Sequence, residues 1–127
     1  MSTGPFRPRR LLVPYDFGPS GDRALRVARM LAPLAVHVVH VLPPPGFGWT
    51  RDEPRQRDAL DALKAALSGT GLEAATRHVL IGEIAEKVAE LAEKLECDLI
   101  LVSARVGSSL AGDLVGAAGC NVVVVRG

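Results

Sequence analysis

The most informative stretch of this 127-residue sequence is Asp98-Leu-Ile-Leu-Val-Ser-Ala-Arg-Val-Gly-Ser-Ser109. Its apolar run, Leu99 to Val102, is continuous rather than alternating, which is typical of a strand buried on both faces of a sheet. Small residues then lead into a helical pattern that begins near Ser109. In parallel α/β sheets, ligands bind beyond the carboxyl ends of the strands, where helix N-termini present unpaired N–H groups. We therefore expect any binding site in this turn.

Strand-like and helical patterns alternate on either side of this stretch. Further strands are predicted over residues 10–16, of which 11–13 are the buried part, and over 36–42, 72–80 and 122–125. The strand over 72–80 is more polar and so nearer a sheet edge. Helices are predicted after an N-cap at Ser20, over residues 59–67 and 83–95, and over 109–117. This order predicts an α/β fold, a doubly wound five-stranded parallel sheet that is Rossmann-like. The domain spans residues 10–127, and residues 1–9 form an N-terminal tail.

Composition and charge argue against several classes of partner. Fifteen basic and 14 acidic residues give a net charge of +1, so no field for binding polyanions is implied, and we interpret Arg7, Arg9 and Arg10 as part of a solvated tail. No run reaches the roughly 18 apolar residues that span a bilayer. Cys97 and Cys120 are too few for a disulfide framework and are expected to be buried thiols. We expect a cytoplasmic protein that binds neither membrane nor nucleic acid.

Five motifs, in order and with sensible spacing, resemble those of the universal stress protein family. They are Leu12-Val-Pro-Tyr-Asp16, Val38-Val-His-Val-Leu-Pro-Pro44, Gly82-Glu-Ile-Ala-Glu86, Asp98-Leu-Ile-Leu-Val102 and Ala118-Gly-Cys-Asn-Val-Val-Val-Val-Arg126. The resemblance runs from residue 10 to residue 126. It implies the strand order 3-2-1-4-5 and usually a homodimer.

The same resemblance points to a departure at the phosphate-binding loop. Many members of the family bind ATP through G-x-x-G, nine residues and then G-[ST], between the fourth strand and the fourth helix. Here Ser103 and Val106 stand at the two glycine positions, Ser108-Ser109 stands at the Gly-Ser position, and only Gly107 remains of the spacer. A Cβ atom at the glycine positions blocks the close approach of the backbone to phosphate. We therefore predict that the ATP cradle is absent and that the protein has no cofactor.

A residual site remains possible at the carboxyl edge of strands 1 and 4. Asp16 matches a family residue that contacts the nucleotide or its metal, and the alternative is a helix-entry aspartate that bonds local N–H groups. Val41 matches a position whose backbone meets adenine, although its side chain belongs to the core. Gly107, Ser108 and Ser109 keep hydroxyls at a helix N-terminus, which suits either weak anion binding or plain helix capping.

No catalytic constellation accompanies these residues. His37, His40 and His78 lack metal-ligand spacing, and His37 and His40 should lie on opposite faces of one strand because they are three residues apart. No G-x-S-x-G elbow surrounds any of the serines near the fourth strand. We therefore predict that the protein is not an enzyme, and an enzyme ranks last among the hypotheses.

The leading hypothesis is a non-catalytic homodimer that acts in the stress response through protein contacts and does not bind ATP. Its interface is expected along Val122, Val123, Val124 and Val125, an apolar edge strand without proline, lysine or a bulge. The alternative to the dimer is a monomer whose edge is covered by the fourth helix or by residues 43–54. The alternative function is a small nucleotide- or anion-binding module that uses the residual site.

Overall fold

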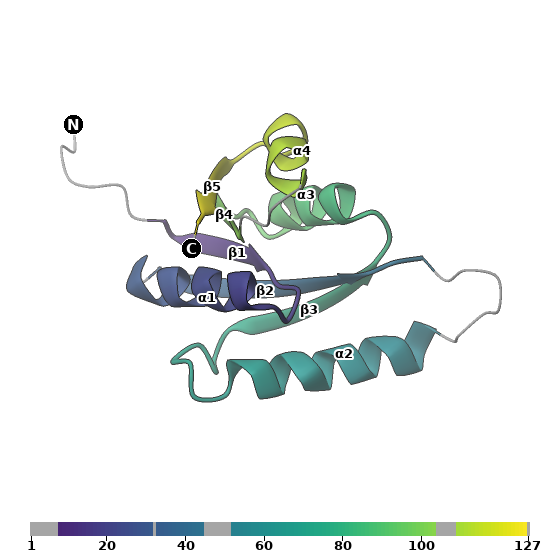
Figure 1. The fold of residues 1–127 in the computed structure, drawn as a ribbon. Coiled ribbons are helices and arrows are strands. Elements are labelled where there is room, and N and C mark those ends of the chain that lie inside the picture. The colour runs from purple at the N-terminus through teal and green to yellow at the C-terminus, as the bar shows by residue number, and fades with distance from the viewer. Residues whose placement is uncertain (1–7, 32, 45–51, 104–108, 127) are drawn as a thin grey trace, which may run out of the picture.

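The computed structural model describes residues 8–31, 33–44, 52–103 and 109–126. Within these ranges, five strands form one parallel sheet in the order β3-β2-β1-β4-β5 (Figure 1). The strands are β1 (Arg10–Pro14), β2 (Ala35–Leu42), β3 (Thr76–Ile81), β4 (Leu99–Ser103) and β5 (Asn121–Val125). The helices are α1 (Pro19–Leu31), α2 (Asp52–Leu67), α3 (Ile84–Lys94) and α4 (Leu110–Ala117). The predicted doubly wound α/β fold and strand order are confirmed.

Two predicted element starts are wrong for local reasons. Ser20 is not the N-cap of α1, because the helix begins at Pro19 and the N–H of Asp22 already donates to the carbonyl of Gly18 at 3.1 Å. Proline suits the first helical position, where its missing N–H would have no partner in the helix. The strand predicted from residue 72 begins at Thr76, because Leu72 instead accepts a turn hydrogen bond from the N–H of Ala75 at 3.0 Å.

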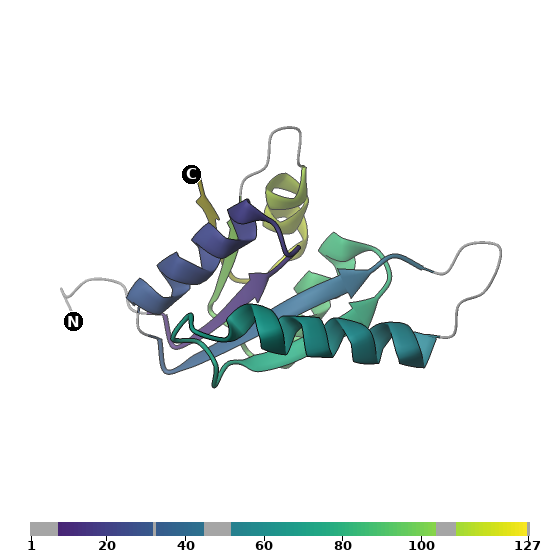
Figure 2. The ribbon, with the colours of Figure 1, turned by 60° about the horizontal axis from the view of Figure 1, so that its bottom comes forward.

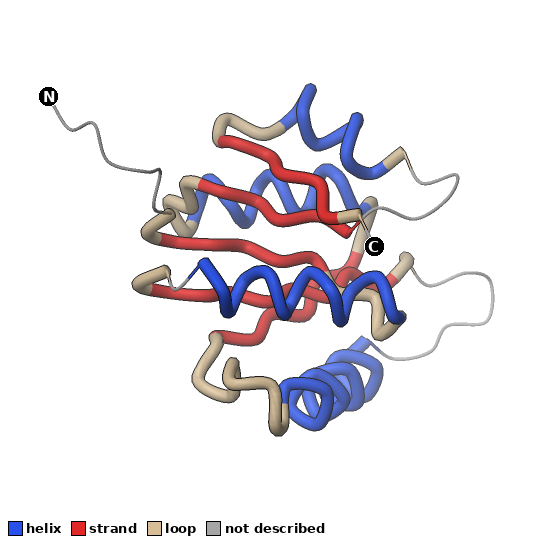
Figure 3. The backbone as a smooth tube through the Cα atoms, turned by 60° about the vertical axis from the view of Figure 1, so that its left-hand side comes forward, coloured by secondary structure: helices blue, strands red, loops and turns tan. Residues whose placement is uncertain are grey.

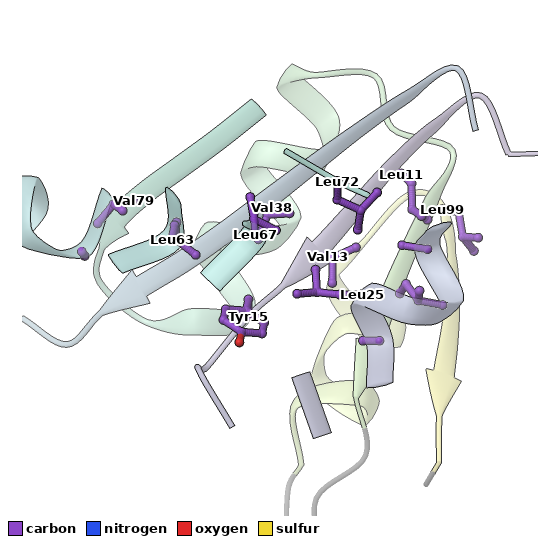
Figure 4. Packing of buried hydrophobic residues seen from close by; sticks show 14 residues of the cluster. Leu11, Val13, Tyr15, Leu25, Val38, Leu63, Leu67, Leu72, Val79 and Leu99 are labelled. Atoms are coloured by element: carbon purple, nitrogen blue, oxygen red, sulfur yellow. The ribbon is translucent and has the colours of Figure 1, made fainter. Parts of the chain in front are cut away.

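One face of the sheet is covered by α1 and α2, and helices lie on both sides of the strands (Figure 3). The core on this face joins long side chains from both helices to alternate residues of the strands. Figure 4 shows Leu25 of α1 and Leu63 and Leu67 of α2 packed around Val13 and Val38 of the sheet. This face carries most of the large aliphatic burial, which is the main stabilising term of the fold.

The opposite face is covered by α3 and α4. Its core contains Val88 and Leu91 of α3, Leu114 of α4, and Leu12 and Ile100 of the sheet. The remaining buried positions of α3 on this face are small, since they are alanines.

Asp98 joins the amino ends of β1 and β4. Its two carboxylate oxygens accept the backbone N–H groups of Arg9 at 2.9 Å and of Arg10 at 3.0 Å. Burial acts to raise the pKa of Asp98, but these two hydrogen bonds outweigh it and the pKa is lowered. The first residue of the stretch quoted above therefore fixes the position of β4 beside β1.

The two edges of the sheet are covered differently. Helix α2 runs alongside β3, as Figures 1 and 2 show, and β3 lies at an edge as its polarity predicted. At the other edge, the side chains of Val123 and Val124 in β5 are 43% and 41% exposed, although α1 and α4 both contact that strand. None of the helices in the described ranges has the length and apolar character needed to cross a membrane.

Candidate functional site

A cleft of about 440 Å³ lies at the carboxyl ends of β1, β2 and β4. Strand β1 and the turn after it contribute Pro14, Tyr15 and Asp16, and β2 contributes Val39, His40 and Val41. The remaining walls are Val102 and Ser103 at the end of β4, Glu83 and Ile84 at the start of α3, and Ser109, Leu110 and Asp113 at the start of α4. Strands β1 and β4 are the pair at which the chain switches sides of the sheet, where open α/β folds bind their ligands.

The cleft brings together three of the sequence-predicted site residues, namely Asp16, Val41 and Ser109. Ser103, which stands at the first glycine position of the family motif, also lines it. Gly107 and Ser108, together with Val106 at the second glycine position, lie outside the described residues.

Asp16 has both of the features that the sequence left open. Its Oδ1 accepts the backbone N–H of Gly18 at 3.0 Å, which is the local hydrogen bond of a helix-entry aspartate. The same carboxylate lines the cleft, so its negative charge also faces any ligand there.

An aromatic cluster at the cleft was not predicted from the sequence. Phe17 packs edge-on between the rings of Tyr15 and His40, with ring centroids 5.1 Å and 4.8 Å apart. The backbone of Phe17 is in the left-handed region, at φ 65°, which turns its ring toward these partners. The Nδ1 atom of His40 lies 2.8 Å from the carbonyl oxygen of Tyr15, so Nδ1 carries the proton and donates it to this hydrogen bond. Only the β1–β2 register places His40 beside this turn.

Tyr15 is held by α1 rather than by the cleft. Its hydroxyl donates to Oδ1 of Asp22 at 2.6 Å. Burial, and then the neighbouring Asp22 carboxylate, raises the pKa of Tyr15, so the phenol stays protonated. The tyrosine therefore acts as a fixed wall of the cleft and not as a base.

Ser109 occupies the N-cap position of α4 without forming a side-chain cap. Its hydroxyl instead donates to Oδ2 of Asp113 at 3.4 Å, a long and weak hydrogen bond. The carboxylate of Asp113 therefore sits in the first turn of α4, at the helix end that would otherwise attract an anion.

The N-terminus of α3 is capped by the chain itself. Both carboxylate oxygens of Glu83 accept N–H groups of the first turn, Oε1 from Ala85 at 3.1 Å and Oε2 from Glu86 at 2.8 Å. The sequence predicted Glu83 near this helix end, and the structure shows that it uses the N–H groups an anionic ligand would need.

The cleft is therefore acidic. Among the described residues, Asp16, Glu83 and Asp113 line it and no lysine or arginine does. Phosphate groups are bound by cations and free N–H donors, whereas three carboxylates around a partly desolvated cleft repel them.

The other candidate residues lie elsewhere. His37 and His78 face each other from β2 and β3, with Nδ1 and Nε2 3.0 Å apart. Cys97 is buried, which raises its pKa to about 11, and burial also raises the pKa of Cys120. Over the described ranges, no three histidine, cysteine or acidic side chains are grouped so that they could hold a metal ion.

Comparison with known proteins agrees with the fold. The model of the universal stress protein family matches residues 8–126. None of the curated proteins matches this sequence significantly.

Solved structures of universal stress proteins superpose over most of the chain. One from Archaeoglobus fulgidus, in complex with dAMP, is 26% identical, with a TM-score of 0.65 over 94% of this chain and 98% of the other. One in complex with cAMP is 17% identical, with a TM-score of 0.69 over 95% and 98%. A family member from Arabidopsis thaliana with AMP bound is 13% identical, with a TM-score of 0.64 over 94% and 92%.

Proposed function

This chain belongs to the universal stress protein family, and we propose that it is a non-catalytic homodimer that acts through protein contacts and does not bind ATP tightly. The observation that carries the proposal is the acidic cleft, in which Glu83 already caps the α3 N-terminus. Some relatives of known structure hold adenine nucleotides. In this chain, the carboxylates that line the cleft would oppose the phosphate groups of such a ligand.

The absence of catalysis is part of the same proposal. Within the described residues, neither Ser103 nor Ser109 is hydrogen-bonded to His40, and the hydroxyl of Ser109 has only the long 3.4 Å hydrogen bond to Asp113. An activated serine needs a close pairing with a base.

The second candidate is a small nucleotide- or anion-binding module. It is favoured by one observation, that Asp16, Val41 and Ser109 line the same cleft. The carboxylates of Asp16 and Asp113 oppose the anionic part of such a ligand, so any residual affinity should come from its base and sugar.

Isothermal titration with adenosine, AMP and ATP separates the two candidates. A phosphate cradle makes affinity rise with each added phosphate, whereas an acidic cleft makes it fall. We expect the dissociation constant for ATP to be ~1 mM or weaker, which corresponds to a binding free energy of about −4 kcal/mol. The affinity should not increase from adenosine to ATP.

A pair of carboxylate substitutions, one in the cleft and one outside it, gives this titration a matched control. Asp113→Asn removes charge from the cleft, whereas Asp58→Asn removes the same charge from the exposed surface of α2. Any weak binding of AMP should improve only in the first variant. ATP that co-purifies with the unmodified protein, or that binds it at micromolar concentration, would refute the proposal.

The dimer is proposed through antiparallel pairing of two β5 strands. An exposed edge strand presents unpaired N–H and C=O groups, and Val123 and Val124 add apolar side chains to it. Helix α4 contacts β5 but leaves both valines more than a third exposed, so the helix does not cover the edge. A two-fold axis beside β5 would bury the valines and pair the backbone groups.

Light scattering behind size exclusion tests this interface. We expect a mass of roughly twice 13.4 kDa at micromolar protein. Val124→Pro and the milder Val124→Lys should both give monomer, whereas Thr76→Lys, at the opposite edge of the sheet, should leave the dimer intact. A monomer before any substitution would show that the β5 interface is wrong.

A further inference from the structure

Besides the cleft, the described residues form a groove of about 640 Å³ on the α3 side of the sheet. It lies between α3 and the turn that leads from α4 into β5. Ala85, Ala89 and Ala92 of α3 line it from one side, and Ala117 and Gly119 line it from the other. These small side chains would allow another backbone to approach closely.

A row of carboxylates forms the outer wall of this groove. Glu86, Glu90, Glu93 and Glu96 follow one another at about one per turn along α3 and past its end, and no described lysine or arginine lines the groove. Glu90 is paired with Lys87 at 3.6 Å and Glu96 with Arg10 at 3.5 Å. Glu86 and Glu93 form no ion pair with any described residue, so the wall keeps a net negative charge.

The turn after α4 leaves room beside the groove, which Gly119 lines. A Cβ atom added at Gly116 or Gly119 would meet nothing within 4 Å. Neither position therefore needs glycine to avoid a clash with neighbouring residues of this chain.

We propose that this groove binds a basic, amphipathic helix of a partner protein. This inference rests on the proposed function, in which the protein acts through protein contacts, and it names the surface that makes them. The lining follows the whole of α3, whose 11 residues span about 16 Å, the length of three helical turns. Alanines facing the small residues of the groove would let the two helices pack closely. Lysine or arginine on the flank of the incoming helix would pair with Glu86 and Glu93.

Fluorescence anisotropy with a designed probe tests the proposal. The probe is a labelled helical peptide of about 18 residues, with alanine and leucine on one face and lysine along its flank. A twin peptide with glutamate in place of every lysine is the control. We expect the basic peptide, and not its acidic twin, to bind with a micromolar dissociation constant. Added salt should weaken this affinity at least tenfold, because it shortens the range of charge attraction.

Variants of the full chain locate the binding. Glu86→Lys with Glu93→Lys should weaken it at least tenfold. Asp58→Lys with Asp61→Lys makes the same change of net charge on the exposed surface of α2 and should leave it within a factor of two. Gly119→Leu keeps the charge but fills the groove, and it should also weaken binding several-fold. Circular dichroism of each variant confirms that it is folded.

Three outcomes overturn the proposal. One is the absence of binding to the basic peptide, and another is equal loss in the two charge-reversal variants, which would indicate attraction by net charge alone. The third is unchanged binding by Gly119→Leu, which would place the peptide outside the groove. ATP titration of the same preparations keeps the two proposals separate, because tight ATP binding refutes the proposed function whatever the peptide does.

Discussion

The two faces of the sheet differ in how completely they are closed. Helices α1 and α2, with 13 and 16 residues, cover one face with long side chains such as Leu25, Leu63 and Leu67. Helices α3 and α4, with 11 and 8 residues, cover the other with fewer large side chains, among them Val88, Leu91 and Leu114, together with alanines, and α4 contains two glycines. The acidic cleft and the acidic groove both open on the α3/α4 side, and Glu83 lines both of them.

This difference separates stability from recognition. A face closed by large aliphatic side chains contributes most of the free energy of folding, although a hollow of about 450 Å³ also lies between α2 and the start of β3. A face covered by short helices and small side chains contributes less, and its concave surface stays accessible. Binding is therefore expected where the structure is least tightly packed.

The largest predicted effect compares a core truncation on each face. Leu63 and Leu114 are both fully buried, one under α2 and the other under α4. Leu63→Ala should lower the free energy of unfolding by about 3 kcal/mol, and Leu114→Ala by about 2 kcal/mol, because short α4 can shift into the space that is created. Urea unfolding measures both. A larger loss for Leu114→Ala would contradict the difference between the faces.

A smaller effect of opposite sign is predicted at the open side of α4. Gly116→Ala should raise the free energy of unfolding by about 0.5–1 kcal/mol, since a Cβ there meets nothing and alanine favours the helix. Gly71→Ala is the control, because Gly71 has φ +85° and its Cβ would lie 2.6 Å from the side chain of Arg29. Thermal unfolding should show the first variant stabilised and the second destabilised. Destabilisation by Gly116→Ala would mean that α4 is packed more closely than described.

The smallest effect is a dependence of stability on pH from the histidine pair. Burial lowers the pKa of His37 and of His78, and the cations of Arg10 and Lys94 add to it. The unfolded chain, with histidine pKa near 6.5, then binds protons before the folded chain does. Stability should therefore be highest above about pH 6.5, the pKa of histidine in the unfolded chain, and fall as the pH is lowered below it toward the lowered pKa values of the folded state. The loss should be small because both rings are partly exposed.

Thermal unfolding across this pH range, in the unmodified protein and in His37→Asn with His78→Asn, measures the contribution. The double variant should show a flatter dependence on pH. Asp98 does not contribute to the pH dependence of stability in this range, because its lowered pKa keeps the carboxylate ionised throughout. A protein that becomes more stable on acidification would contradict the prediction.

Much of the fold could be predicted because its signals are local. Continuous apolar runs at residues 11–13 and 99–102 predicted buried parallel strands, and the polarity of the third strand predicted an edge. The misplaced start of α1 shows the limit, since both Pro19 and Ser20 are acceptable near a helix start. Only the hydrogen bond from Asp22 to Gly18 distinguishes them.

Less of the site could be predicted. Asp16, Val41 and Ser109 were named from the sequence and lie in one cleft, but its acidic character needed Glu83 and Asp113 as well. Those two belong to the starts of different helices, and the spacing of residues along the chain does not tell which helix starts meet. The same is true of the contacts of Phe17 with Tyr15 and His40.

Sequence patterns were thus sufficient for the order of the elements, the parallel sheet and the family, because periodicity and strand-end motifs act over a few residues. Tertiary structure alone revealed that Glu83 caps α3 while lining the cleft, and that the glutamates of α3 face the glycine-containing turn after α4. Those features depend on how far apart the helices lie and which sides they turn to each other. Packing sets both, and residues distant in the chain determine packing together.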